Sequence, residues 1–294
     1  MKYQAFLRTA ELGNITQAAE SLGYTQPAVS RMIAELEKEW GVTLLIRSRT
    51  GVRLTSDGAY LLPHIREVCT AQKNLAGHVS HLHGLTSGTI RVGTFVAVAL
   101  QWLPAMIRSF QDLCPNIEVQ LKSCLEYGEV EQWIAQGIVD CGFLTLPLAQ
   151  AHTPPLYARF LHRDPLLALL PEDHPLAGAE AYPVSRFSQD PFIQLLEERD
   201  RDTADLFEAF GIQVTPRYVS ENGIIIMSMV ESGLGVGLSN EMMLGKTAYR
   251  IVPKPLDPPQ FRDIAIASRP LASASPATRR FVEHVEEWVG ETYP

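Results

Sequence analysis

The fold of the N-terminal part is decided by residues 14–33, which read NITQAAESLGYTQPAVSRMI. The first half predicts a helix with Thr16 as its N-cap residue and Gly23 as the glycine just beyond its C-terminus. The second half predicts another helix, capped by Thr25, with Pro27 in the first turn, where a missing N–H costs nothing. Two helices joined by so short a glycine turn indicate a helix-turn-helix.

The second helix of this pair has two distinct faces. Val29, Ile33 and Leu36 follow the i, i+4, i+7 rule and are expected to face the core. The opposite face carries Pro27, Arg31, Ala34 and Lys38, with Gln26 and Ser30 beside them near the N-terminal end. Arg and Gln side chains can make bidentate hydrogen bonds to guanine and adenine in the major groove, so this end is a candidate DNA-reading surface. Taken alone, the pattern also fits an ordinary solvated helix face.

The flanking residues favour the DNA-binding interpretation. Apolar residues at 3, 6, 7 and 10 predict a preceding helix that Gly13-Asn14 ends. After Gly41, two short β-prone runs at 42–46 and 52–54 flank a turn that contains Gly51, which predicts a hairpin wing. The alternation of this hairpin is expected to place its arginines on the exposed side, within reach of phosphates or a minor groove. These arginines are Arg47, Arg49 and Arg53.

Residues 57–82 predict one long helix, interrupted only by Pro63 near its start. An apolar seam with steps of four and three residues runs along it, formed by Leu61, Ile65, Val68, Gln72, Leu75, Val79 and Leu82. Such a seam is best buried against a second copy of the helix, with Gln72 fixing the register, so a dimer is expected. Packing against the chain's own body is the alternative. His78, His81 and His83 lack a carboxylate or cysteine beside them, so no metal site is expected.

From residue 89 the pattern changes to alternating strands and helices, which predicts a mostly parallel, doubly wound sheet in two lobes. The first set comprises strands at 89–95, 117–123 and 140–146 and helices at 101–111 and 129–136. The second set comprises strands at 166–170, 192–195, 217–219 and 236–239 and helices at 203–210 and 224–232. A strand at 261–268 and a final helix at 276–291 are expected to return to the first lobe, giving two hinge crossings.

The composition bounds the class of protein. The chain has 294 residues, 46% of them apolar and 20% charged, which is typical of a soluble protein of about two domains. No apolar run is long enough to span a membrane and no signal peptide is visible, so we expect a cytoplasmic protein. The net charge is −8, whereas residues 1–60 carry +1. The four cysteines show no C-x-x-C spacing and are expected to be buried thiols, with a Cys114–Cys124 redox pair as the alternative.

The chain resembles the LysR-type transcriptional regulators. The resemblance is carried by residues 14–33, Leu36-Glu37, Leu44, Arg47 and Leu54-Thr55, and in the second half by residues 92–95, 102–104, 140–144, 174–176 and 229–237. It implies that Thr25, Gln26, Pro27, Ser30 and Arg31 occupy DNA-reading positions, with the wing arginines on the DNA backbone. Leu45 replaces the usual Phe and Ser56-Asp57 the usual Glu-Ala pair, and neither change touches the reading face.

The resemblance also implies an overall α/β architecture. An N-terminal all-α winged helix-turn-helix (1–58) is followed by a long dimerising linker helix and hinge (59–86). A two-lobed effector domain similar to periplasmic binding proteins (type 2) follows at 87–294, with lobe I at about 87–161 and 267–294 and lobe II at about 162–266. A small polar ligand is expected between the lobes, lined by Thr94, Phe95, Ala97, Val98, Ser123, Leu144, Thr145, Phe192 and Ile193. Ala97 stands where many relatives carry a Ser or Thr that holds a ligand carboxylate.

The expected partners are double-stranded operator DNA, a small-molecule effector and further copies of the chain, as a homodimer through the linker helix and a homotetramer by resemblance. RNA polymerase stays open as a further partner, and no membrane, cofactor, metal or catalytic residue is expected. An enzyme is disfavoured because Gly233-x-Gly235-x-Gly237 lacks the spacing of a dinucleotide loop and Gly245-Lys246-Thr247 lacks the upstream glycine of a phosphate loop. A DNA-binding regulator of the same fold without an effector is the main alternative.

Overall fold

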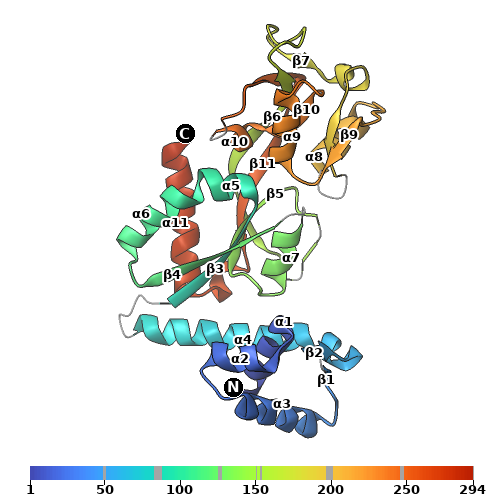
Figure 1. Ribbon diagram of the computed structural model, residues 1–294. Helices are drawn as coiled ribbons and strands as arrows, with labels where there is room; N and C mark the ends of the chain where they lie inside the picture. Colours follow the sequence, from blue (N-terminus) through green and yellow to red (C-terminus); the bar gives the residue numbers. More distant parts are fainter. Residues whose placement is uncertain are drawn as a thin grey trace. The chain divides into compact units, whose positions relative to one another are not determined.

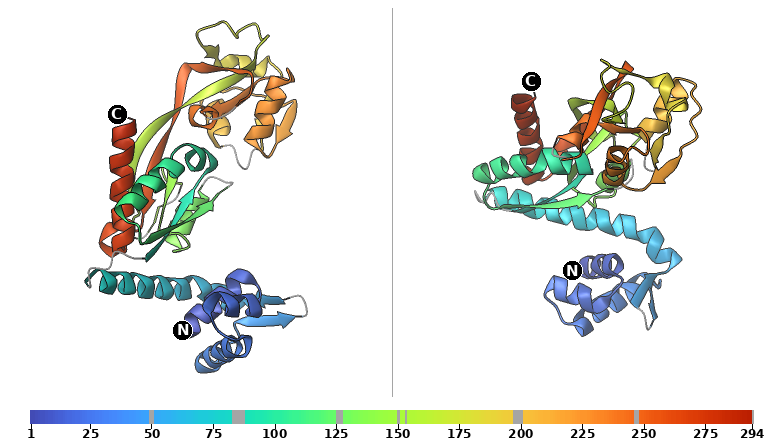
Figure 2. Two further views of the ribbon diagram at one scale, coloured as in Figure 1. Left: turned by 60° about the vertical axis from the view of Figure 1, so that its left-hand side comes forward. Right: turned by 45° about the horizontal axis from the view of Figure 1, so that its top comes forward.

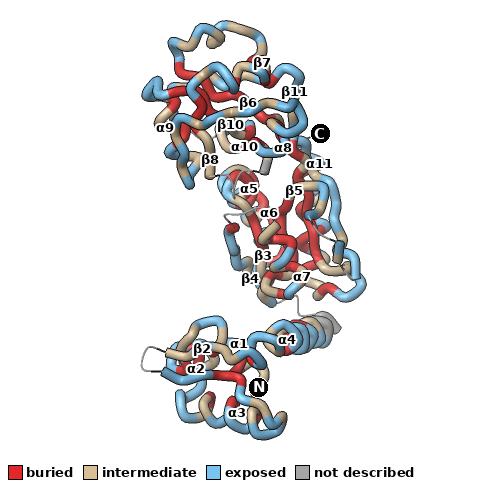
Figure 3. Tube along the Cα trace, turned by 90° about the vertical axis from the view of Figure 1, so that its right-hand side faces the viewer, coloured by how far each residue is buried: buried red, intermediate tan, exposed pale blue. Residues whose placement is uncertain are grey.

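The structure is a computed structural model that describes residues 1–48, 51–82, 88–124, 128–149, 151–152, 154–196, 201–245 and 248–293. The chain forms two compact units, of which the first comprises Met1–Leu85 and the second begins at Thr86. Each unit has its own buried interior (Figure 3). The expected α/β architecture, with a helix-turn-helix unit followed by a two-lobed unit, is confirmed (Figure 1).

The first unit begins with three helices, α1 (Lys2–Leu12), α2 (Ile15–Leu22) and α3 (Gln26–Trp40). Their core contains Phe6, Val29, Ile33 and Leu36, as the helical spacing predicts. The expected N-cap of α2 is wrong, because Asn14 holds that position. Its side chain accepts hydrogen bonds from the backbone N–H groups of Thr16 (2.8 Å) and Gln17 (3.1 Å). Asn caps as well as Thr does, and the earlier start brings Ile15 into the helix and the core.

The predicted hairpin wing forms from β1 (Leu45–Ser48) and β2 (Gly51–Leu54), paired from Leu45 opposite Leu54 to Ser48 opposite Gly51. Its first strand begins later than expected, so residues 42–44 are not part of it. The backbone here makes hydrogen bonds outside the hairpin: the Glu37 carboxylate accepts the N–H groups of Leu44 (2.7 Å) and Leu45 (3.1 Å). The Thr55 hydroxyl also donates to the Thr43 carbonyl (2.7 Å).

The long helix α4 (Ser56–Leu82) begins after Thr55, whose hydroxyl accepts a hydrogen bond from the N–H of Gly58 (2.9 Å). The expected seven-residue seam is wrong in its first part, because Ile65 is buried in the core of the first unit together with Cys69. The exposed apolar residues of this helix include Val68, Leu75 and Val79, which are 43%, 65% and 45% exposed. A seam that could pair with a second helix therefore begins only at Val68.

A seven-stranded sheet runs through the second unit, in the order β10-β6-β11-β5-β3-β4, with β7 (Tyr182–Pro183) added to β11. Strand β3 (Gly88–Thr94) is parallel to β4 (Ile117–Ser123) and β5 (Cys141–Leu146). The remaining pairings along this order are antiparallel, so the expectation of a mostly parallel sheet is wrong.

The reason is the length of β6 (Tyr157–Pro171) and β11 (Ile251–Ser268), which the sequence predicted as two short strands. They pair antiparallel from Tyr157 opposite Ser268 to Pro171 opposite Ile251 and run together through both lobes (Figures 1 and 2). At one end of this pair β11 adds β5, and at the other end β6 adds β10 (Gly237–Asn240). The two long strands are therefore the connections between the lobes.

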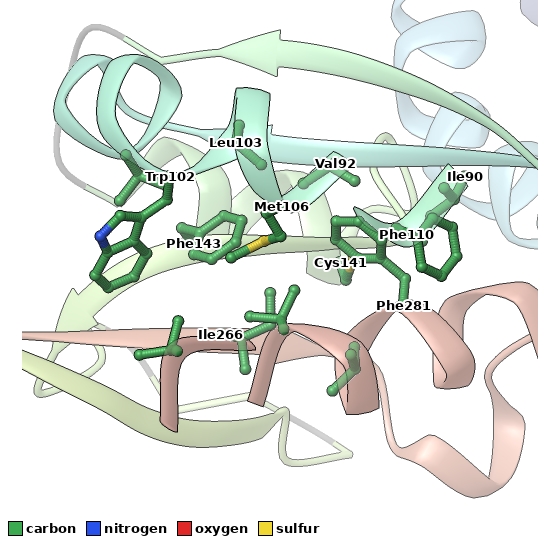
Figure 4. Close-up of a cluster of buried hydrophobic side chains, with 14 of the residues drawn as sticks. Ile90, Val92, Trp102, Leu103, Met106, Phe110, Cys141, Phe143, Ile266 and Phe281 are labelled. Atoms are coloured by element: carbon green, nitrogen blue, oxygen red, sulfur yellow. The ribbon is translucent and has the colours of Figure 1, made fainter. Parts of the chain in front are cut away.

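The first lobe is completed by helices on its sheet, and the second by a smaller parallel pair of strands. The first-lobe helices are α5 (Val96–Gln101), α6 (Leu103–Leu113), α7 (Glu129–Ala135) and the C-terminal α11 (Pro276–Thr292). The second lobe contains β8 (Ile193–Leu195), β9 (Tyr218–Ser220), α8 (Arg201–Ala209), α9 (Gly223–Glu231) and α10 (Glu241–Leu244). In the first-lobe core, Phe281 of α11 packs against Phe110, and Trp102 packs against Phe143 (Figure 4).

Two helical glycines give opposite expectations for replacement by alanine. A Cβ on Gly58 would fall against the backbone carbonyl oxygen of Leu44, far inside van der Waals distance, whereas a Cβ on Gly290 would meet nothing within 4 Å. Gly58→Ala should lower the free energy of unfolding by about 1–3 kcal/mol through this clash. Gly290→Ala should raise it by about 0.5–1 kcal/mol, because alanine restricts the unfolded chain. Urea unfolding followed by circular dichroism measures both, and a Gly58→Ala variant as stable as the parent would contradict the expectation.

Candidate nucleic-acid interface and ligand cavity

The N-terminal end of α3 presents the predicted reading residues on one surface. Thr25, Gln26, Pro27 and Arg31 are exposed and Ser30 is partly buried, while Val29 on the opposite face is fully buried. The helix begins at Gln26, so these side chains cluster on its first two turns. This surface combines hydrogen-bond donors and acceptors with one cation, as a DNA-reading surface does.

The wing arginines do not share one exposed side, which corrects the expectation. Arg47 lies opposite Val52, and Arg53 lies opposite Ile46. Because successive residues of a strand point to opposite faces, Arg47 and Arg53 lie on different faces of the hairpin. Arg47 faces α3, where its Nη1 donates a hydrogen bond to the Ser30 hydroxyl (2.9 Å). Both arginines are exposed, and Arg49 lies outside the described residues.

The second unit contains a cavity of about 320 Å³ lined by residues of both lobes. Four of the nine predicted effector residues line it: Phe95 and Ala97 after β3, and Leu144 and Thr145 at the end of β5. The second lobe contributes the start of α9 and the end of β10. The other five predicted residues, which are Thr94, Val98, Ser123, Phe192 and Ile193, are not part of the wall.

Each of these five residues is absent from the wall for a local reason. Val98 is fully buried in the first-lobe core, and Phe192 and Ile193 are buried in the two hydrophobic clusters of the second lobe. The Thr94 hydroxyl donates to the carbonyl of Phe95 (3.2 Å), and that side chain is almost completely buried. Ser123 is exposed, and the next residue along the chain, Cys124, lines the cavity instead.

A buried ion pair that the sequence did not predict lies at the wall. Arg262 of β11 stands directly opposite Asp164 of β6, and its Nε and Nη2 donate to one Asp164 carboxylate oxygen at 3.0 and 2.7 Å. The other carboxylate oxygen accepts the backbone N–H of Met242 (3.0 Å). The guanidinium also lies over the Phe95 ring, 4.9 Å from its centroid, and 3.9 Å from the Asp202 carboxylate. Each partner belongs to an Arg-Asp dipeptide that directly precedes an apolar run, Arg163-Asp164 in β6 and Arg262-Asp263 in β11, and this is the signal that could have indicated the pair.

A second acidic group of the wall, Glu131, is paired in the first lobe. Its carboxylate contacts His152 Nε2 (2.6 Å) and accepts the N–H of Ala149 (2.8 Å). Cys124 lies nearby in the wall, and burial raises the pKa of its thiol to about 12, so the thiol stays protonated at neutral pH. All four cysteines are free and buried, as expected. Among the described residues, no group of three or more His, Cys, Asp or Glu is placed to hold a metal ion.

The glycine-rich segment at 233–237 is used for packing. A Cβ on Gly235 would overlap the carbonyl of Pro191, and a Cβ on Gly237 would lie 3.0 Å from Ile226. Gly233 follows α9 with a φ of +71°. The segment is therefore a turn with close backbone approaches between α9 and β10.

A winged helix-turn-helix followed by a two-lobed α/β unit with a cavity defines a class of DNA-binding transcriptional regulators. The chain belongs to the LysR family. The family model described as "Bacterial regulatory helix-turn-helix protein, lysR family" matches residues 2–59, and the one described as "LysR substrate binding domain" matches residues 83–290.

Individual relatives agree along the whole chain. The uncharacterised HTH-type transcriptional regulator YvbU of Bacillus subtilis (strain 168) is 31% identical over 290 residues, which cover 98% of this chain and 97% of that protein. A full-length OxyR variant from Pseudomonas aeruginosa shares the fold with a TM-score of 0.79 at 23% identity, over 98% of this chain and 93% of that one. Full-length CbnR complexed with its target DNA has a TM-score of 0.57 at 21% identity, over 98% of both chains.

In the part of the chain that is described, no helix is both long and apolar enough to cross a membrane.

The Arg262–Asp164 pair gives a stability prediction. Arg262→Met leaves the Asp164 carboxylate buried without its counter-charge and should lower the free energy of unfolding by about 3–5 kcal/mol. Adding Asp164→Asn should recover most of this loss, because the amide oxygen can still accept the N–H of Met242. Urea unfolding of the parent, the single variant and the double variant measures both effects. A double variant no more stable than Arg262→Met would show that the loss has another cause.

Proposed function

We propose that the protein is a LysR-type regulator that binds operator DNA through α3 and its wing and changes its DNA binding when a small molecule occupies the cavity. The observation that carries the proposal is the surface at the start of α3, where Gln26 and Arg31 are exposed beside the partly buried Ser30, to which Arg47 is hydrogen-bonded. The solved complex of CbnR with its target DNA supports the same use of the fold. The relatives are transcriptional regulators, which supports a non-enzymatic role.

Within this surface we assign different roles to the two sets of residues. Gln26, Ser30 and Arg31 select the sequence, because they project from the end of α3 that would enter the major groove. Arg47, Arg49 and Arg53 supply affinity through phosphates. The bond from Arg47 to Ser30 adds a link between the sets, since it orients the serine hydroxyl from the wing side. Thr25 and Pro27 complete the proposed contact surface.

Anisotropy titrations with cognate and scrambled duplexes at several salt concentrations separate these roles. Arg31→Ala should cost about 1–3 kcal/mol on the cognate duplex and little on the scrambled one. Arg53→Ala is the matched control in the wing, and it should weaken both duplexes alike and flatten the salt dependence by about one unit. Equal losses on both duplexes for Arg31→Ala, or a cognate-only loss for Arg53→Ala, would reverse the assignment.

The proposal includes a homodimer through α4. Its support is the stripe of Val68, Leu75 and Val79, which lies exposed on a helix whose buried residues Ile65 and Cys69 pack into the core of the first unit. A narrow apolar stripe of this kind is best covered by a second copy of the same helix. By family resemblance, we further propose a tetramer in the cytoplasm that acts together with RNA polymerase.

Leu75→Lys should place a charge in this stripe and weaken dimerisation and DNA affinity together, because two linked half-site contacts become one. Ala76→Lys adds the same charge one residue away, at the edge of the stripe, and should change both much less. Sedimentation and DNA titration of both variants test this expectation. If Leu75→Lys sedimented as the parent does, the pairing surface would have to lie elsewhere.

A further inference from the structure

We infer that the cavity takes an uncharged, mainly apolar small molecule and discriminates against carboxylates and ammonium ions. This inference rests on the proposed function, in which the cavity is the effector site, and it replaces the polar ligand expected from the sequence. Three observations carry it: the apolar wall, the interactions that already engage the charged side chains in the described part of that wall, and the absence of a hydroxyl at residue 97.

Apolar side chains from both lobes form most of the wall. Those that define its shape are Phe95, Phe143 and Leu144 from the first lobe and Leu195, Ile226 and Leu238 from the second. A ligand that fills this space must bring apolar surface to match them, since burying a polar group against such side chains without a hydrogen bond costs free energy. Neutral groups of Thr145, Asn222 and Ser239 are also present in the wall and can orient a ligand through one or two hydrogen bonds.

Among the residues that the structure describes, four charged side chains line the cavity: Glu131, Asp202, Glu221 and Arg262. None of them is without a partner. Glu131 is held by His152 and the N–H of Ala149, and Asp202 lies within reach of Arg262 and of the Asn240 amide (3.4 Å). A charged ligand would therefore lose its hydration without gaining a counter-charge that is not already committed.

A carboxylate ligand is disfavoured most directly. The cation in the described part of the wall is Arg262, and its guanidinium already makes two hydrogen bonds to the almost completely buried Asp164. An incoming anion would meet this guanidinium with the Asp164 and Asp202 carboxylates beside it. Ala97, at the start of α5, offers no hydroxyl to share the charge.

Three probes of matched shape test the inference on the full-length protein: 3-phenylpropanamide, 3-phenylpropanoate and protonated 3-phenylpropylamine. Calorimetric titration should show the amide binding about tenfold or more tightly than either ion, because only the ions must leave a charge without a free partner. Equal or tighter binding of the carboxylate or the amine overturns the inference. Failure of the amide to bind at millimolar concentration overturns it as well.

Two neighbouring variants locate the binding site. Ile224 lines the cavity and Ile225 does not, although the two are similarly exposed, at 44% and 52%. Ile224→Trp should fill the cavity and abolish binding of the amide, whereas Ile225→Trp should leave its affinity unchanged. Both residues are exposed enough for the fold to accept the larger ring, which circular dichroism checks. If both variants bind the amide as the parent does, the amide binds outside the cavity and the inference fails.

The double variant Arg262→Met/Asp164→Asn tests whether Asp164 already neutralises the charge of Arg262, so that Arg262 does not bind a ligand anion. The replaced pair is neutral as a whole, as the ion pair is, so the variant should keep the preference for the amide, whereas an anion held by Arg262 would be lost. Loss of the amide preference in this variant overturns the inference.

Operator titrations with each probe separate the inference from the proposed function. One outcome is that the carboxylate binds, that Ile224→Trp abolishes this binding, and that the bound carboxylate changes the affinity for DNA. This outcome would refute the proposed ligand class and support the effector role of the cavity. Amide binding in the cavity without any change in DNA affinity would support the ligand class and refute the effector role.

Discussion

The antiparallel pairing of β6 with β11 is the constraint on which the second unit depends. These two strands carry the seven-stranded sheet through both lobes, with β5 added at one end and β10 at the other. Arg262 and Asp164 face each other where the pair passes from one lobe to the other, so the ion pair is fixed by strand register. The cavity lies between the two lobes that these strands connect, and one of its charged wall residues, Arg262, belongs to the connection itself.

This placement explains why the arginine is a poor anion receptor. A buried side chain at this connection must remain paired, because a buried charge left alone costs several kcal/mol. Asp164 is 1% exposed and also accepts the N–H of Met242, so its position is fixed by two independent bonds. The pair therefore serves the connection between the lobes, and ligand recognition falls to the neutral groups and apolar surface around it.

Local signals in the sequence predicted most elements, and long-range constraints account for the differences. The boundaries of β4 and the C-terminal glycines of α1 and α2 follow from residues nearby in the chain. The length and direction of β6 and β11 depend on partners about a hundred residues away, which periodicity cannot supply. In the candidate site, too, local sequence signals predicted some of the wall residues and missed others. The ends of the predicted strands placed Phe95 and Thr145 correctly at the cavity, whereas at the end of β4 the cavity is lined by Cys124, the residue after the strand, and not by Ser123.

The periodic apolar pattern of α4 contributes residues both to the core of the first unit and to the exposed stripe. Its apolar residues continue without a break in spacing, yet Ile65 packs into the core of the first unit while Leu75 is exposed. From Val68 to Val79 the exposed stripe covers roughly 16 Å of helix, so the surface left for pairing is short. Pro63 lies in the part of α4 that precedes this stripe. A pair formed through the stripe would thus be connected to each DNA-reading surface through the earlier part of α4, where Ile65 packs into the same core as Val29 and Ile33 of α3.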